Sequence, residues 1–267
     1  MRLNRIYAIV LRQAYLLRGS LTRVVPLFVW VALDIVMWGF ITRYLTSVMP
    51  AGLNVVPVFL GAILLWDFLV RVMQGVTMAF MEDSWSRNFL NMFASPLRIS
   101  EYIIGMVLSS VATSAVGLIV MLLLASSVFG LSFFSYGVML VPFLLMLFLF
   151  GIALGIVGCA IMLRLGPAAE WFVWPIPAII SPFACVFYPL STLPYWMQTI
   201  AQLLPPSYVF EGMRTIIGGG TMPASGLLAG FGLTFLYIIA AAILFTRVYR
   251  HAVKTGLIAR YSAESVS

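Results

Sequence analysis

Six long apolar runs constrain the fold of this chain more than any other feature. They cover about residues 25–48, 55–80, 102–129, 134–163, 171–188 and 227–245. Each is near or above the roughly 20 residues with which a helix crosses about 30 Å of hydrocarbon. Lipid offers the backbone no hydrogen-bond partner, so continuous runs fold as helices, whereas barrel strands alternate over about 10 residues. The sequence predicts an all-α membrane protein with six transmembrane helices, in a single domain over residues 1–267.

The composition agrees with this and excludes several classes of protein. Of 267 residues, 63% are hydrophobic and 9% charged, so no sizeable soluble domain fits. The net charge of +7 comes from residues that flank the apolar runs, which favours membrane lipid over nucleic acid as a partner. Cys159 and Cys185 both lie in apolar stretches, which indicates packing rather than a disulfide or a metal site.

No motif for chemistry is found. The single histidine, His251, lies in the basic tail, and H-E-x-x-H, G-x-S-x-G and paired-aspartate motifs are absent from the sequence. A Walker A loop is absent as well, so any dependence on ATP must come from another chain. We expect a protein that is not an enzyme, with no catalytic residue, no metal and no cofactor of its own.

The fifth run differs from the others because it is rich in proline. Prolines remove backbone donors, and such breaks are tolerated in a membrane only where protein or a water-filled cavity satisfies the freed carbonyls. Residues 191–225 then form the longest segment between spans, in which residues 194–204 predict a short amphipathic or re-entrant helix before Pro205 and Pro206. The prolines of the run and its end are Pro175, Pro177, Pro182 and Pro189.

The N-terminal segment, residues 1–24, predicts an interfacial amphipathic helix. Its arginines interrupt any continuous apolar core of a signal peptide. On a helical wheel Arg2, Arg5, Arg12 and Gln13 share one sector, and the apolar residues lie mostly elsewhere. The alternative is a cytoplasmic extension of the first span.

The orientation follows from the basic residues. With six spans, twelve of the 15 Lys and Arg residues fall on the side of both termini, two on the other side, and Arg71 within a span. The positive-inside rule therefore predicts cytoplasmic termini, a cytoplasmic loop at residues 84–100 and an extracytoplasmic segment at residues 191–225.

The cytoplasmic loop contains a candidate docking element. Residues 86–93 predict a short helix that Pro96 ends before the third span, with Phe89, Leu90, Met92 and Phe93 beside Arg87 and Arg98. Apolar groups of this kind indicate docking onto a partner protein. The alternative is a helix that lies on the lipid headgroups.

Charged residues inside the apolar runs are the other functional signal, since a charge at bilayer depth costs at least about 2.5–3.5 kcal/mol. Asp34 lies in the first run, and Asp67, Arg71 and Gln74 follow one face of the second helix at i, i+4 and i+7. These residues either neutralise one another and fix the packing of the helices, or line a translocation path.

Two further patterns each leave two interpretations open. Gly151 and Gly155 form a G-x-x-x-G motif in the fourth run, which allows close approach of helices within the subunit or between two subunits. The aromatic residues around the fifth run either grip an apolar substrate or form an interfacial belt. They are Trp171, Phe172, Trp174, Phe183, Phe187 and Tyr188.

Two stretches give the chain a family resemblance. Residues 88–105 read NFLNMFASPLRISEYIIG, and residues 187–214 read FYPLSTLPYWMQTIAQLLPPSYVFEGMR. With the basic N-terminal segment and the six apolar runs, they resemble the ABC-2 family of permeases, the membrane subunits of bacterial ATP-driven exporters. The segment before the first span lacks the G-x-L-W-x-x-x-x-P pattern of glycan-exporting members.

The resemblance implies roles for particular residues. The coupling helix of that family, which sits in a groove of the ATPase, corresponds here to Arg87, Phe89, Leu90, Met92, Phe93 and Pro96. The outer-face segment corresponds to the stretch with Pro189, Pro194, Pro205, Glu211 and Arg214. The implied partners are two ATPase subunits, which bind ATP and Mg, and a second permease chain, identical or different.

The combined expectation is a permease of the cytoplasmic (inner) membrane that exports an amphipathic, drug-like or lipid-linked compound with a separate ATPase. Two alternatives stay open. One is a transporter or channel without an ATPase, and the other is an intramembrane enzyme that modifies lipids.

Overall fold

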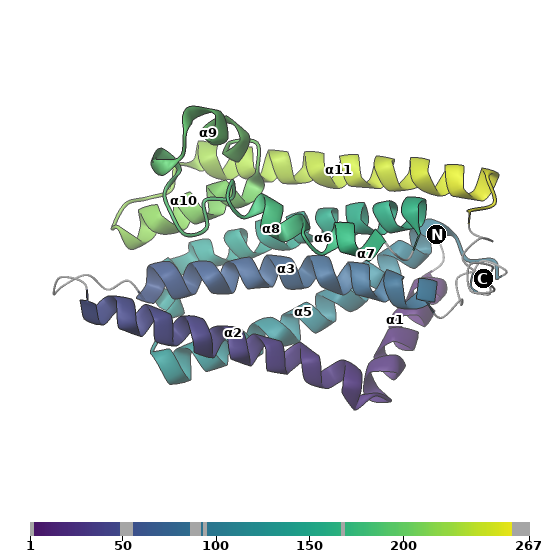
Figure 1. Cartoon of the computed structure of the whole chain (residues 1–267), viewed down its shortest axis with the longest axis horizontal. Coiled ribbons are helices and arrows are strands. Elements are labelled where there is room, and N and C mark those ends of the chain that lie inside the picture. Colours follow the sequence, from purple (N-terminus) through teal and green to yellow (C-terminus); the bar gives the residue numbers. More distant parts are fainter. Residues whose placement is uncertain (1–2, 49–55, 86–91, 93–94, 167–168, 258–267) are drawn as a thin grey trace.

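The computed structural model describes residues 3–48, 56–85, 92, 95–166 and 169–257, and these residues form helices and no strand. Figure 1 shows long helices lying side by side in one bundle. The elements are α1 (Leu3–Arg18), α2 (Leu21–Val48), α3 (Val56–Trp85), α5 (Ile99–Phe129), η1 (Phe133–Met139), α6 (Leu140–Leu165), α7 (Glu170–Val173), α8 (Ile176–Ile180), η3 (Leu190–Thr192), α9 (Tyr195–Ala201), α10 (Pro205–Ile217) and α11 (Ala224–Lys254).

Five of the six predicted spans are confirmed as single helices. Within the described residues, α2, α3, α5, α6 and α11 are long and apolar enough to cross a membrane. Their lengths follow from uninterrupted apolar sequence, since helices satisfy their own backbone groups in lipid.

The fifth run is not the continuous helix that the sequence predicts. It is divided into α7 and α8, and no helix is assigned to residues 181–189. Pro175 precedes α8 and Pro177 lies in its first turn, where a missing N–H costs nothing, but neither fits the middle of a longer helix. The segment nevertheless runs the length of the bundle: α7 lies near the end that holds α1, α8 lies midway, and α9 lies at the opposite end (Figure 1).

The segment between the fifth run and α11 is more helical than predicted. The short helix expected at residues 194–204 is found as α9, which ends before Pro205. Pro205 then begins α10 instead of only ending a helix, because proline fits the first turn of a helix. The helix ends at Ile217, before the glycines at 218–220.

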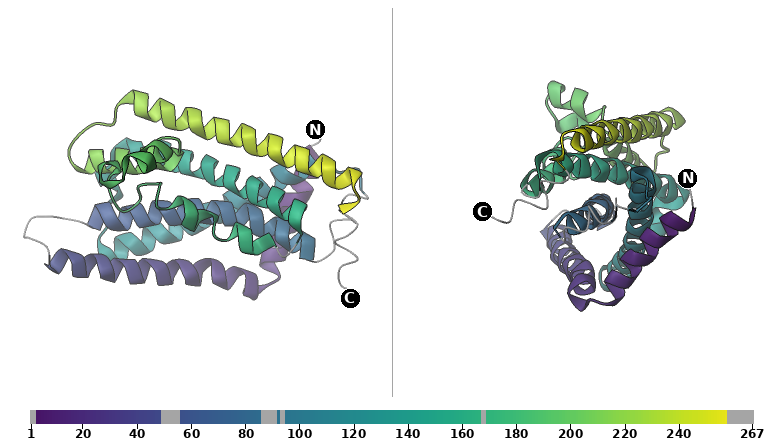
Figure 2. Two further views of the ribbon diagram at one scale, coloured as in Figure 1. Left: turned by 45° about the horizontal axis from the view of Figure 1, so that its top comes forward. Right: turned by 90° about the vertical axis from the view of Figure 1, so that its right-hand side faces the viewer.

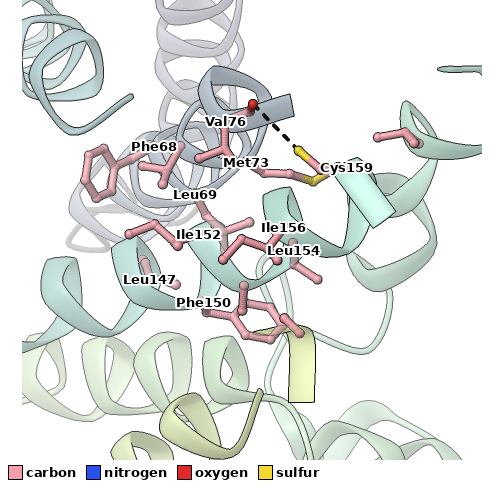
Figure 3. Packing of buried hydrophobic residues seen from close by; sticks show 14 of the residues in the cluster. Phe68, Leu69, Met73, Val76, Leu147, Phe150, Ile152, Leu154, Ile156 and Cys159 are labelled. Atoms are coloured by element: carbon pink, nitrogen blue, oxygen red, sulfur yellow. Dashed lines mark hydrogen bonds between the residues drawn. The ribbon is translucent and has the colours of Figure 1, made fainter. Parts of the chain in front are cut away.

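The α3–α6 contact is the centre of the core. A Cβ atom on Gly151 would lie 2.9 Å from the Leu69 carbonyl oxygen, and one on Gly155 would lie 3.0 Å from the Met73 carbonyl oxygen. The G-x-x-x-G motif therefore packs α6 against α3 within the subunit. Figure 3 shows this packing, in which buried side chains of both helices interlock and the Cys159 thiol lies 3.9 Å from the Val76 carbonyl oxygen.

The N-terminal helix α1 lies across one end of the bundle (Figure 2, right). Ile6, Ile9 and Gln13 are buried there. A Cβ atom on Gly105 of α5 would lie 2.6 Å from Ile9, so this glycine allows α1 to pack closely on α5. The exposed side of α1 carries Leu3 and Tyr7. The sector that the sequence predicts as polar therefore turns partly into the protein.

Candidate functional site

A polar stripe lies inside the span formed by α3. Asp67, Arg71 and Gln74 share one face of this helix and are all half-buried, as predicted. Asp34 lies on the neighbouring helix α2, and its charge interacts with Arg71 and with Asp67. The structure therefore brings together the four intramembrane polar residues that the sequence indicates, with α2 and α3 as their supports.

Helix α5 makes room for this stripe. A Cβ atom on Gly117 would lie 2.8 Å from Cδ of Arg71, so the glycine leaves space that the arginine side chain occupies. Ser110, which lies before Gly117 on α5, donates a hydrogen bond to the Val72 carbonyl oxygen at 3.1 Å. Ser114 lies between Ser110 and Gly117, is 1% exposed, and its hydroxyl has no hydrogen-bond partner among the described residues.

A small hollow with a cavity volume of about 10 Å³ lies between α3 and the broken fifth run. Gln74 belongs both to this hollow and to the polar stripe, so the two features are continuous along α3. The hollow is otherwise largely apolar, with Thr77 as its other polar side chain. Its remaining lining residues are Met73, Met78, Met81, Val173, Trp174 and Pro177.

At the end of the bundle that holds α1, a buried ion pair joins α1 to α3. Arg12 Nη1 donates to Asp83 Oδ2 at 3.0 Å, and Arg12 Nη2 also contacts this carboxylate. The Tyr102 hydroxyl of α5 donates to Asp83 Oδ2 at 2.8 Å. Asp83 is fully buried, and its hydrogen bond raises the pKa of Arg12 above the ordinary value. The guanidinium therefore stays charged, and its contact with Asp83, together with the Tyr102 hydroxyl, holds three helices together.

A second ion pair joins α1 to α5. Arg5 of α1 contacts Glu101 at 3.4 Å, and Glu101 is 1% exposed. The same carboxylate accepts a hydrogen bond from the Arg98 backbone N–H at 3.1 Å and so caps the start of α5. Asp83 and Glu101 lie at the two ends of the segment at residues 84–100, so α1 is tied to the helices on both sides of it.

At the opposite end of the bundle, Arg214 of α10 binds the backbone of the broken run. Its guanidinium donates to the carbonyl oxygen of Cys185 and to that of Val186, the latter at 3.2 Å. Glu211 accepts from Arg214 at 2.8 Å and from the Leu190 N–H at 2.7 Å. The freed backbone groups near the prolines are therefore satisfied by protein, which is the condition for a broken helix in a membrane. Cys185 itself has a left-handed backbone, with φ of 57°.

The sequence as a whole matches a known family. The family model for the ABC-2 type transporter covers residues 7–217, which is well over half of the chain. The chain belongs to the ABC-2 type transporter family. It is a transmembrane permease, and the family is a transport family and not a catalytic one. No curated protein matches the sequence of this permease.

The residues expected to form the coupling helix of the permease are only partly described. Met92 is half-buried and packs against the main core, and Pro96 is exposed. The predictions for Arg87, Phe89, Leu90 and Phe93 lie outside the described residues.

The predicted outer-face residues have different surroundings. Glu211 and Arg214 belong to the network that holds the broken run. Pro189 and Pro194 are exposed and precede η3 and α9, while Pro205 is buried at the start of α10.

The aromatic residues of the fifth run also have different surroundings. Trp174 lines the hollow, whereas Trp171 and Phe172 are exposed. Phe187 stacks on Trp38 of α2, with ring centroids 5.7 Å apart. The stack joins α2 to the broken run.

Sequence reasoning missed the two ion pairs that α1 makes with α3 and α5. Arg12 and Asp83 are 71 residues apart, and no periodicity connects them. One signal was available in the sequence. Asp83 and Glu101 are acidic residues near the ends of the two spans that flank residues 84–100, where a basic N-terminal helix could pair with them. The lining of the hollow was also missed, because α7 and α8 were expected as one continuous span.

Proposed function

We propose that this permease is the membrane subunit of an ATP-driven exporter that moves an amphipathic, drug-like or lipid-linked substrate across the cytoplasmic (inner) membrane. A separate ATPase, present in two copies, binds ATP and Mg and supplies the energy. A second permease chain, identical or different, completes the transport unit. The single observation that supports this most is the polar stripe, which lies inside a spanning helix and continues into the hollow.

The proposed translocation path follows from the position of the polar stripe. A substrate needs apolar walls for its tail and polar groups at depth for its head. The side chains around the small hollow between α3 and the α7–α8 pair are of the first kind, and Gln74, Arg71 and Asp67 are of the second. The hollow has room for about one water molecule in this structure, so it must widen to admit a substrate. In this proposal the broken run forms one wall and moves away from α3 when a substrate enters. We place the substrate between α3 and this run.

In this proposal the broken run completes a sixth crossing, and both termini are cytoplasmic. The helix ends that carry Arg164 and Lys254 lie at the same end of the bundle as α1 (Figure 1), which supports this orientation by the positive-inside rule. Labelling of single cysteines in intact cells tests it. An impermeant reagent should modify Ser191→Cys and spare Ser262→Cys, and the reverse pattern would overturn the topology.

The segment at residues 84–100 is the proposed contact with the ATPase. When the ATPase dimer closes, it pushes on this segment, and the ion pairs of α1 hold the adjoining helix ends together so that the push reaches the spans. The deciding experiment is a pull-down with an ATPase assay on the purified complex in lipid.

The variant for this assay is Phe89→Ala with Met92→Ala. Loss of apolar anchors at an interface commonly costs about 2 kcal/mol or more, so less ATPase should be recovered and substrate should no longer stimulate hydrolysis. Expression and membrane insertion should remain near wild type. Normal recovery and normal coupling in the double variant would show that the segment only lies on the membrane.

A further inference from the structure

The end of α11 carries a row of basic side chains that the proposed function does not use. They are exposed and recur at i, i+3, i+4 and i+7, so they share one face of the helix. This basic stripe consists of Arg247, Arg250, His251 and Lys254. It lies beyond residue 217, where the family match ends. None of its side chains forms an ion pair with another residue in the described part of the chain.

The other cations at this end of the bundle are arranged differently. Arg5 and Arg12 of α1 are paired with buried carboxylates. Three exposed arginines lie singly on α1, directly before α5 and on α6, and these are Arg18, Arg98 and Arg164. The dipole of α11 favours cations in its last turn, but the basic stripe begins before that turn, at Arg247. The stripe is therefore more than a cap on the helix end.

The basic stripe continues the side of α11 that faces away from the bundle. Only 17% of the spanning window of this helix is buried, and Figure 1 shows α11 along the outer edge of the bundle. Leu236, Ile239 and Ile243 are exposed, and on a helical wheel they fall in roughly the same third of the circumference as the stripe. After Ile243 this side changes from apolar to basic. Such a change is typical of a helix that leaves the hydrocarbon and enters the layer of lipid headgroups.

We propose that the basic stripe of α11 binds the phosphate headgroup of an anionic phospholipid, such as phosphatidylglycerol, in the leaflet at that end of the bundle. Guanidinium groups bind phosphate oxygens in pairs, and a lysine adds a point charge. The acyl chains of the same lipid then lie along the exposed apolar side chains of α11. An acidic protein surface is a poorer match, because the stripe borders directly on these apolar side chains. The inference goes beyond the proposed function, since it concerns the lipid around the permease and not its substrate.

The test offers the purified permease, in a neutral detergent, an equimolar mixture of dioleoyl phosphatidylglycerol and dioleoyl phosphatidylcholine. Native mass spectrometry counts the molecules of each lipid that remain bound. Each basic residue near the headgroups adds about fivefold to the binding of an anionic lipid, so wild type should retain phosphatidylglycerol in roughly tenfold excess or more. The α11 triple variant, Arg247→Gln with Arg250→Gln and Lys254→Gln, should lower this excess by roughly tenfold.

A matched control removes the same number of positive charges at the same end of the bundle. Arg18→Gln with Arg98→Gln and Arg164→Gln should leave the excess within about twofold of wild type, because these residues lie singly. Arg247→Lys with Arg250→Lys keeps the charge and should keep most of the excess. If the α11 triple variant does not fold, as judged by gel filtration, Arg250→Gln takes its place, with an expected loss of about fivefold.

Three outcomes overturn the proposal: no excess of phosphatidylglycerol on wild type, equal losses in the α11 variant and the control, or displacement of the lipid by inorganic phosphate beyond that by chloride at equal ionic strength. The last outcome would assign the basic stripe to a free phosphate. An α11 variant that keeps the lipid but recovers less ATPase in a pull-down would assign the stripe to the ATPase. The lipid measurements involve neither ATP nor substrate, so their failure would leave the proposed transport function intact.

Discussion

The two ends of the bundle use arginine for different purposes. At the α1 end, Arg12 joins two separate helices through a buried carboxylate, and the partners are 71 residues apart. At the α10 end, Arg214 and Glu211 are neighbours on one helix and bind backbone groups of a broken run. The first arrangement clamps whole helices together, and the second compensates for a local loss of helical hydrogen bonds. The α1 end therefore holds separate helices together, whereas the α10 end stabilises an irregular wall.

The largest effect is expected from Arg12→Ala, which leaves the Asp83 carboxylate buried without its guanidinium. Breaking one side of a buried pair commonly costs about 3–5 kcal/mol. Titration with SDS from dodecyl maltoside micelles measures the free energy of unfolding. The exposed Arg18 on the same helix provides the matched control, because Arg18→Ala should change it by less than about 0.5 kcal/mol. Equal losses in the free energy of unfolding of both variants would contradict the role of the Arg12–Asp83 pair in holding α1 to α3.

The second effect is expected from Arg214→Ala. The carbonyl oxygens of Cys185 and Val186 lose a charged donor, and a buried unsatisfied group costs about 1–3 kcal/mol. The cysteines report where the loss occurs, since Cys185 and Cys159 are both buried and free. A maleimide should label Cys185 faster in this variant and still spare Cys159 in the α3–α6 contact. Labelling of both cysteines at one rate would indicate general unfolding and refute a local role.

A smaller effect is expected from Tyr102→Phe, which tests whether Tyr102 acts through its hydrogen bond to Asp83 or only through packing. Tyr102→Phe removes the hydroxyl that donates to Asp83 but keeps the ring, and should cost about 1 kcal/mol. When Tyr102→Phe is made on the background of Asp83→Ala, which leaves no acceptor, the same loss should vanish if the two groups act only through each other. A double-variant cycle on the SDS titration measures this coupling, and purely additive losses would show that the Tyr102 hydroxyl does not act through Asp83.

The smallest effect is expected from Tyr188→Phe at the α10 end. The Tyr188 hydroxyl donates to the Pro182 carbonyl oxygen at 2.6 Å in an exposed setting, where water replaces the lost bond. The free energy of unfolding should fall by less than about 0.5 kcal/mol. A loss as large as that of Tyr102→Phe would show that the ends of the bundle differ less than their burial indicates.

How far the sequence predicted this structure depends on whether a feature is local. The five long helices follow from length and hydropathy, which are properties of each segment alone. The alignment of Asp67, Arg71 and Gln74 follows from helical periodicity, and the packing role of Gly151 and Gly155 from their spacing.

Features that depend on distant partners were not predictable in the same way. The sequence around Asp83 does not indicate that this residue is buried, because its partner Arg12 comes from another helix. Pro205 was interpreted as a stop, whereas it begins α10, because a proline ends one helix and starts another with the same backbone geometry. The break of the fifth run was visible in its prolines, but the position of α7 and α8 against α3 depends on contacts that one segment does not specify.

The glycine contact between α3 and α6 has a consequence for how the permease moves. Backbone atoms of α3 lie so close to Gly151 and Gly155 that α3 cannot turn about its own axis without separating from α6. The direction in which Asp67 and Arg71 point is therefore fixed with respect to the core. Helix α2, of which 18% of the spanning window is buried compared with 56% for α3, is less enclosed by the bundle, and we expect it to be the neighbour that changes position. The distance between labels on α3 and α6 should then stay constant during a transport cycle. It provides the reference for measuring the displacement of α2.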